Sequence, residues 1–242
     1  MKHILVKNDL FRLSRNKQVF EIEFVRPPNR VLVDSLVQTR LLENENVTLS
    51  EDYRTLQFKA FSASAFLDWE LEERSIGSSL QMLSSLTTQL SYLIDHGHTF
   101  IGYNTKNIIV INGSVFVFLD SELLTEIVCG VGGVGGRDVG VGVRYPFSVH
   151  DFYFSPELLK ITEIPSVVSY KTAYFSLGFL LLEWISSKGK EGKDLYKEYL
   201  RADDPCSFIK ERLASSIPKS KLYWLLERSL VEDPLERSLL FL

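Results

Sequence analysis

The chain has few cysteines and no long apolar run. Cys129 and Cys206 are the two cysteines among 242 residues, and they form neither a metal-ligand spacing nor a disulfide framework. The most apolar stretch, residues 173–185, contains Ser176 and Glu183 and is shorter than the roughly 20 residues that a membrane-spanning helix needs. No signal peptide opens the chain. We therefore expect a cytoplasmic or nuclear protein that is not secreted and has no membrane partner.

An excess of positive charge is also absent. The net charge is −4 and the sequence pI is about 5.7, which excludes a general attraction to nucleic acid or acidic lipid. We expect no nucleic-acid partner. The apolar fraction of 45% over 242 residues is ordinary for a globular protein and is enough to form a sizeable core. This length corresponds to one large domain or two small lobes.

Glycine is missing from the beginning of the chain and concentrated later. The first glycine is Gly77, and seven of the fourteen glycines lie in residues 129–143. Residues 130–135 match the pattern G-x-G-x-x-G, but a phosphate-binding loop of that kind needs a strand before it and a helix directly after it. We interpret residues 129–143 as a flexible Gly/Val-rich loop.

Residues 1–67 have the pattern of a small, mostly β lobe. Phe20, Ile22 and Phe24 alternate with glutamates, which is typical of a half-buried strand. Asn29 precedes a run with apolar positions at Leu32 and Leu36, which predicts a capped helix. The expected strands cover residues 3–6, 19–25, 47–49 and 55–61, and the expected helix covers residues 30–42.

From residue 68 onward the pattern becomes mainly helical. Leucines at spacings of three and four define one buried helix face before residue 94. Two apolar runs, residues 108–111 and 115–119, then flank Asn112-Gly113, a strong signal for a β-hairpin. The leucines of the helix face are Leu83, Leu86, Leu90 and Leu93.

Residues 92–120 resemble the catalytic core of a eukaryotic-type protein kinase. Asn107 and Asp120 have the separation that is usual in kinases, and they match the metal-binding Asn of the catalytic loop and the Asp of the D-F-G motif. In that family the general-base Asp lies five positions before the Asn, where this chain has Gly102. A glycine can neither accept a proton nor orient a hydroxyl group. The resemblance is therefore to a pseudokinase, with no catalytic residue at position 102.

Three further motifs extend the resemblance through residue 237. Ser155-Pro156-Glu157 resembles the A-P-E motif, residues 175–178 resemble W-S-L-G, and Asp233-Pro234 with Arg237 resembles the end of the kinase fold. The resemblance implies a structural ion pair between Glu157 and Arg237. It also implies a two-lobed α+β protein-kinase-like fold, with a reduced β-rich N-lobe at residues 1–67 and a helical C-lobe at residues 68–242.

Other positions depart from the kinase pattern. The Asp of the central helix, which in kinases tethers the catalytic loop, is replaced by Ala173, so we expect that anchor to be lost along with H-R-D. The Lys of the catalytic loop is replaced by Asn104. The D-F-G motif reads Asp120-Ser121-Glu122, and no glycine-rich turn or recognisable ATP-binding Lys precedes it.

The resemblance thus implies a catalytically inactive scaffold or allosteric regulator whose partner is another protein, without a required cofactor. The alternative is a divergent protein kinase or a nucleotide-binding switch, in which Asn107 and Asp120 hold ATP with Mg²⁺ or Mn²⁺. In a third interpretation, the two side chains only form hydrogen bonds that shape loops. The aromatic residues 145–154 are either a peptide-docking surface or a packing segment.

Overall fold

The computed structural model describes residues 2–42, 47–69, 75–129, 139–148, 151–186, 194–218 and 220–239. Within these residues the chain is α+β, with antiparallel sheets and helices, as expected. Two compact units are present. Unit 1 comprises Met1–Glu73, Gln81–His98 and Thr105–Leu124, and unit 2 comprises Arg74–Leu80, Thr99–Asn104 and Thr125–Leu242. The division into domains at residues 1–67 and 68–242 stays a prediction.

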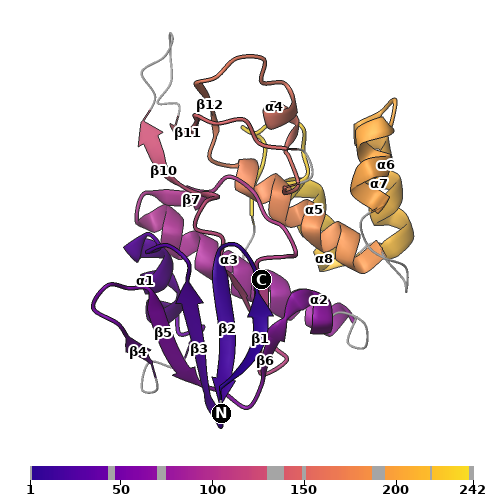
Figure 1. The fold of residues 1–242 in the computed structure, drawn as a ribbon. Coiled ribbons are helices and arrows are strands. Elements are labelled where there is room, and N and C mark those ends of the chain that lie inside the picture. The colour runs from indigo at the N-terminus through magenta and orange to yellow at the C-terminus, as the bar shows by residue number, and fades with distance from the viewer. Residues whose placement is uncertain are drawn as a thin grey trace. The chain divides into compact units, whose positions relative to one another are not determined.

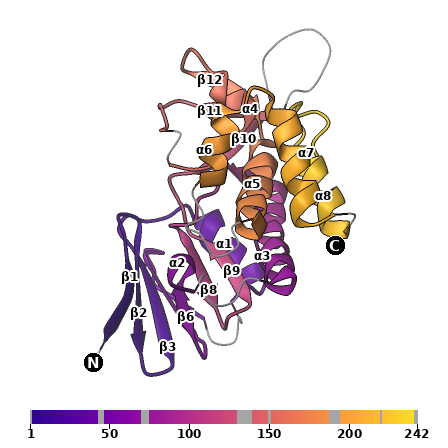
Figure 2. The same cartoon turned by 90° about the vertical axis from the view of Figure 1, so that its right-hand side faces the viewer.

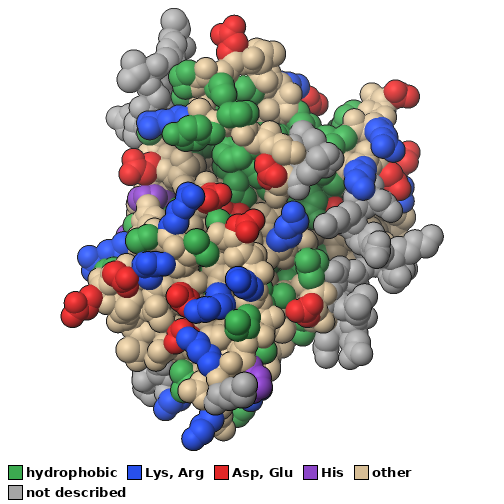
Figure 3. All heavy atoms as spheres, viewed as in Figure 1, with side chains coloured by type: hydrophobic (Ala, Val, Ile, Leu, Met, Phe, Trp, Pro, Cys, Tyr) green, Lys and Arg blue, Asp and Glu red, His purple; other side chains and the backbone are tan. Residues whose placement is uncertain are grey.

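Unit 1 contains an antiparallel sheet in the order β1-β2-β3-β5-β4 (Figure 1). Phe20, Ile22 and Phe24 are fully buried, as their alternation predicts. On the face seen in Figure 3, basic and acidic side chains are interspersed over these strands, so one face is core and the other is polar. The strands are β1 (His3–Lys7), β2 (Phe11–Asn16), β3 (Val19–Phe24), β4 (Thr48–Leu49) and β5 (Thr55–Lys59).

Helix α1 (Arg30–Gln38) packs its apolar side into the core of this sheet. The Asn29 side chain accepts a hydrogen bond from the Val31 N–H, which confirms the predicted cap. The helix ends earlier than expected, because Arg40 has a φ of 58°, a left-handed conformation that a helix cannot contain.

A second sheet of unit 1 has the order β6-β8-β9. The predicted hairpin is present, and Asn112 and Gly113 have φ values of 53° and 68°, as a tight hairpin turn requires. Figure 2 shows β6, β8 and β9 beside α2. The elements are β6 (Ala63–Ala65), α2 (Phe66–Trp69), β8 (Ile108–Ile111) and β9 (Val115–Phe118), and α3 (Ile76–Asp95) has residues in both units.

Unit 2 contains a sheet in the order β12-β11-β10-β7, which corrects our interpretation of residues 129–143 as a loop at its described end, residues 139–143. Within that run, the described residues 139–143 form strand β11, because its valines and glycines alternate with the period of a strand. Residues 130–138, with the G-x-G-x-x-G match, lie outside the described residues. The strands are β7 (His98–Phe100), β10 (Leu124–Cys129), β11 (Val139–Val143) and β12 (Ser166–Ser169).

The helices of unit 2 pack around the predicted core helix α5 (Thr172–Ser186), which is buried along most of its length. Its neighbours α6 (Asp194–Arg201), α7 (Pro205–Ser216) and α8 (Lys221–Ser229) contact it (Figure 2). The short helix α4 (Pro156–Leu159) carries the A-P-E-like motif. No helix in the described part of the chain is both long and apolar enough to span a membrane.

Candidate functional site

The β8–β9 hairpin brings Asn107 and Asp120 together. Ile108 pairs with Phe118 at the open end of the hairpin, so the residues just outside that end lie side by side. The Asn107 Nδ2 donates to the Asp120 Oδ2 at 2.6 Å. Both side chains are buried, with 8% and 4% of their surface exposed. The separation of the two residues in the sequence is therefore the length of a hairpin plus its flanking positions.

A third side chain, Asn8, completes this polar cluster. Asn8 lies between β1 and β2, and its Nδ2 donates to the Asn107 Oδ1 at 3.0 Å. Its own Oδ1 accepts hydrogen bonds from the N–H groups of Leu10 and Phe11 at 2.9 and 2.8 Å. Sequence reasoning missed Asn8, although an asparagine directly after a strand is a common turn former.

Asn8 also determines the β1–β2 turn, where the kinase resemblance would place a glycine-rich turn. The N–H groups of Leu10 and Phe11 point to the Asn8 side chain. A phosphate-binding turn uses such N–H groups to hold its anion. Here they are occupied by an internal acceptor, which is consistent with the absence of glycine.

The hydrogen bonds of the cluster set the orientation of both amides. Because Asn8 Oδ1 faces two N–H donors, its Nδ2 must face Asn107, and Asn107 must present its oxygen to Asn8. The Asn107 Nδ2 then faces Asp120. A magnesium ion takes oxygen ligands, and here the Asn107 oxygen already accepts a hydrogen bond while its nitrogen faces the carboxylate.

The two Asp120 oxygens have neutral donors in this cluster. Oδ2 accepts from Asn107, and Oδ1 accepts from the N–H groups of Glu122 and Leu123, each at 3.0 Å. This is the arrangement of a side chain that shapes a turn. The described residues contain no cluster of three or more His, Cys, Asp or Glu side chains that could hold a metal. In this arrangement Asn107 presents its nitrogen to Asp120 and its oxygen to Asn8.

The space beside Gly102, in unit 2, is occupied by an aromatic ring from another segment. A Cβ built on Gly102 would lie 2.6 Å from Cε2 and 2.9 Å from Cγ of Phe152, distances that no side chain tolerates. The Phe152 ring is itself buried and stacks on Phe154, with the ring centroids 4.5 Å apart. The space that a catalytic Asp side chain would take is therefore filled by apolar packing.

The loop around Gly102 is anchored to helix α5 by hydroxyl groups, although Ala173 stands where kinases have the tethering Asp. The Tyr103 N–H donates to the Ser176 Oγ at 2.7 Å, and the Thr172 Oγ1 donates to the Ile101 carbonyl at 3.3 Å. Hydroxyl groups on α5 thus hold the backbone in place of a carboxylate. Thr172 also shares a 2.7 Å hydrogen bond with Ser155.

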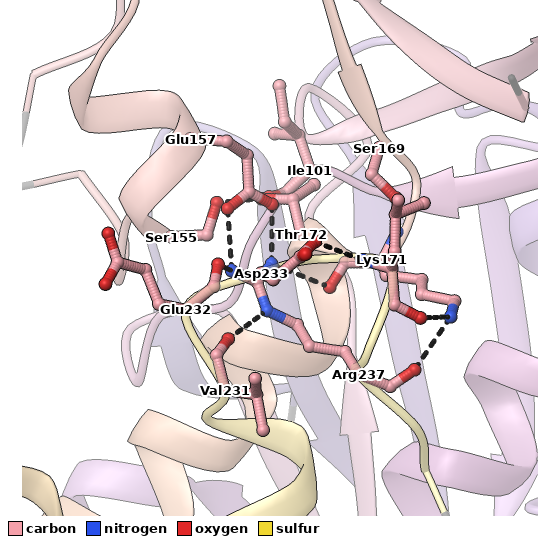
Figure 4. Close-up of polar contacts among 11 residues, drawn as sticks. Ile101, Ser155, Glu157, Ser169, Lys171, Thr172, Val231, Glu232, Asp233 and Arg237 are labelled. Atoms are coloured by element: carbon pink, nitrogen blue, oxygen red, sulfur yellow. Dashed lines mark hydrogen bonds and ion pairs between the residues drawn. The ribbon is translucent and has the colours of Figure 1, made fainter. Parts of the chain in front are cut away.

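The ion pair between Glu157 and Arg237 is present and bidentate (Figure 4). Nη1 lies 2.5 Å from Oε1 and Nη2 lies 2.7 Å from Oε2. Arg237 also donates to the carbonyls of Val231 and Glu232, at 2.6 and 2.7 Å, and its guanidinium lies 5.1 Å from the ring centre of Phe175. The arginine is 1% exposed, so its charge depends on this partner.

Within residues 145–154 the structure separates buried from exposed aromatic side chains. Phe152 and Phe154 are buried, and the Phe154 backbone N–H donates to the Tyr196 hydroxyl at 2.7 Å. Tyr145 is 72% exposed. The end of this segment therefore packs within unit 2, and its beginning is available to solvent.

No protein-family model matches the chain, and no curated protein is similar to it. The function of the chain must therefore be inferred from its own residues.

Proposed function

We propose that the chain is a degenerate protein-kinase-like domain that transfers no phosphate. It acts by binding another protein, as a scaffold or an allosteric regulator in the cytoplasm or nucleus. The order of elements supports the kinase-like part of this proposal. Strands β1 to β3, helix α1, strands β4 to β6 and helix α2 precede α3 and the β8–β9 hairpin, and α4 and α5 follow. The Glu157–Arg237 pair, which the resemblance implies, adds a specific contact.

The observation that carries the proposal is the Phe152 ring beside Gly102. A kinase needs a carboxylate at this position to orient the substrate hydroxyl group. Here the substitution Gly102→Asp alone would make the new side chain collide with the buried Phe152 ring. The absence of the base is therefore accompanied by packing that excludes it.

The outer face of β10–β12 supports a protein partner. Val128 and Gly140 pair across the sheet, as do Gly142 and Val167, so these residues share one face. Val128 and Val167 are exposed, and a Cβ at Gly142 would meet no atom within 4 Å. In Figure 3, hydrophobic side chains gather around β11 and β12. Exposed apolar patches of this kind mark interaction sites in soluble proteins.

The alternative, a divergent kinase or a nucleotide switch, is less well supported. It needs the Asn107 oxygen and the Asp120 carboxylate to face a common metal ion. The Asn8 side chain holds the Asn107 oxygen, and the turn at Leu10 and Phe11 has its N–H groups occupied. A nucleotide complex would first have to rearrange this cluster.

A nucleotide titration combined with a phosphotransfer assay tests the proposal. Wild type, Gly102→Asp, Gly102→Asp with Phe152→Ala, and Asp120→Asn are compared with ATP and ADP, with and without Mg²⁺ or Mn²⁺. We expect no phosphate transfer by wild type or Gly102→Asp, and no metal-dependent stabilisation. A ligand at 100 times its Kd would stabilise the fold by about 2.7 kcal/mol. Transfer by wild type, or a metal-dependent shift that Asp120→Asn abolishes, contradicts the proposal.

A photo-crosslinker placed on the sheet face tests the binding role separately. We expect a discrete protein adduct in cells when Val167 is replaced by p-benzoylphenylalanine. The matched control carries the crosslinker at Trp224, another exposed apolar residue of unit 2. The Asp120→Asn substitution should leave the adduct unchanged. Adducts of equal yield and identity at both positions would remove the support that this face gives to the proposal.

A further inference from the structure

Unit 2 contains a cavity of about 410 Å³ that lies apart from the kinase-like motifs for catalysis. Its walls come from helices α4 to α8 and the segment after α8. Phe175, Tyr199, Ile209 and Leu230 line it, and all four side chains are buried. The volume is within the range of small-molecule sites in proteins, roughly 300–1,000 Å³.

The Glu157–Arg237 network holds two walls of this cavity in place. Arg237 donates to the carbonyls of Val231 and Glu232, two residues that line it. The same guanidinium lies over Phe175, and Glu157 fixes α4, whose Pro156 and Leu159 form another wall. A ligand would therefore enter a formed cavity and would not have to order its walls.

The side chains that line the cavity disfavour a charged ligand. The floor is aliphatic and aromatic, and burial raises the pKa of Tyr199 to about 12, so its hydroxyl is neutral at physiological pH. The charged groups belong to the rim, where Lys160 bonds Glu232 at 2.8 Å. Lys210 adds positive charge to the rim, and Glu227 and Asp233 add negative charge. Both signs are present, so no ionic head group is favoured.

We propose that this cavity binds a small uncharged apolar molecule, such as a medium-length alkyl chain or an aromatic ring system. An apolar cavity of about 150 Å³ is enough for benzene, and this one has more than twice that volume. Transfer of such a ligand from water is favourable in proportion to the apolar area that it buries. The proposed site is independent of whether nucleotide binds.

The exposed thiol of Cys206, which lines the cavity, provides a direct readout. In a Cys129→Ser background, Cys206 is the single thiol of the chain, and its reaction rate with a disulfide reagent is measured with and without 1-decanol. We expect saturating 1-decanol to slow the reaction about tenfold and to raise the melting temperature. Decanoate and decylammonium ions should bind at least tenfold more weakly than the alcohol, as judged by the concentration that protects Cys206.

Two variants fill the cavity, and one control leaves it open. Ile209→Trp places an indole inside, and Leu159→Trp does so from an exposed position that tolerates a large side chain. Glu211→Trp adds the same indole to an exposed position of α7 that does not line the cavity. We expect protection and thermal shift to be lost in both cavity variants and retained in the control. If Ile209→Trp does not fold, Leu159→Trp decides.

Three results would overturn the proposal. The first is the absence of protection and of thermal shift in wild type. The second is equal protection in wild type and in a folded cavity variant. The third is decanoate or decylammonium binding as tightly as 1-decanol, which would show that the charge of the head group is not discriminated.

Discussion

Two carboxylates, Glu157 and Asp120, differ in the hydrogen bonds that they accept. Glu157 is bound by a guanidinium in a bidentate pair, and the arginine is held further by two carbonyls. Asp120 is bound by an amide and two backbone N–H groups. Both positions match kinase motifs in the sequence, and the ion pair that the resemblance implies is present at the first.

Glu157 and Arg237 stabilise the fold, whereas Gly102, Asn107 and Asp120 lie at positions that match catalytic motifs of kinases. Losing one partner of a buried ion pair destabilises the fold, which opposes change at Glu157 and Arg237. Gly102 packs against Phe152, and Asn107 and Asp120 belong to a hydrogen-bonded cluster with Asn8.

Breaking the ion pair should have the largest effect. Arg237→Met leaves Glu157 without its cation and two carbonyls without a donor, and we expect a loss of about 3–5 kcal/mol in the free energy of unfolding. Urea denaturation measures it. The control is Lys160→Met, which removes an exposed pair with Glu232 and should cost less than about 1 kcal/mol. Equal losses would mean that the two pairs are energetically alike.

Adding a side chain at position 102 should have the next largest effect. Gly102→Ala forces a methyl group against the Phe152 ring, and overpacking of this kind costs about 1–3 kcal/mol. The double variant with Phe152→Ala should recover part of the loss in a thermodynamic cycle. If the losses in free energy of unfolding from the two substitutions simply add, the ring does not fill the space beside Gly102.

Removing the turn-forming side chain tests the polar cluster. Asn8→Ala removes the acceptor of the Leu10 and Phe11 N–H groups and the Asn8 donor to the Asn107 oxygen. Solvent can reach part of this site, so we expect a loss of about 1–2 kcal/mol. Asn8→Asp keeps the acceptor for the turn and should lower the free energy of unfolding by less than Asn8→Ala does. A loss for Asn8→Asp as large as for Asn8→Ala would show that the bond to Asn107 dominates.

The anchor on α5 should give the smallest of these effects. Ser176→Ala removes the acceptor of the Tyr103 N–H, and one such hydrogen bond contributes about 1 kcal/mol. Hydrogen exchange at the Tyr103 amide should accelerate more than exchange at amides elsewhere in unit 2. Unchanged exchange would mean that another group holds this loop.

Local patterns predicted several elements correctly. The Asn112-Gly113 hairpin, the Asn29 cap and the buried helix α5 each follow from short stretches of residues, because turn chemistry and hydrophobic periodicity act locally. Strand β2 was missed, and β11 was interpreted as a loop. The conformation of both depends on pairing with neighbouring strands.

Of the candidate site, sequence reasoning found Gly102, Asn107 and Asp120 and the Glu157–Arg237 pair. It missed Asn8 and Phe152, which alter what the first three can do. Neither has a signal of its own, since one asparagine after a strand and one phenylalanine in an aromatic segment are common. Their roles come from contacts between segments that are far apart in the sequence.

The sequence by itself determined which chemical groups are present and which are absent. No glycine precedes Gly77, no carboxylate lies at position 102, and both Glu157 and Arg237 are present. Only the tertiary structure decided which groups meet. The Asn8 side chain reaches Asn107, the Phe152 ring fills the space beside Gly102, and the helices of unit 2 line an open apolar cavity. The physical reason is that side-chain identity is a local property, whereas burial and hydrogen-bond pairing depend on segments that are distant in the chain.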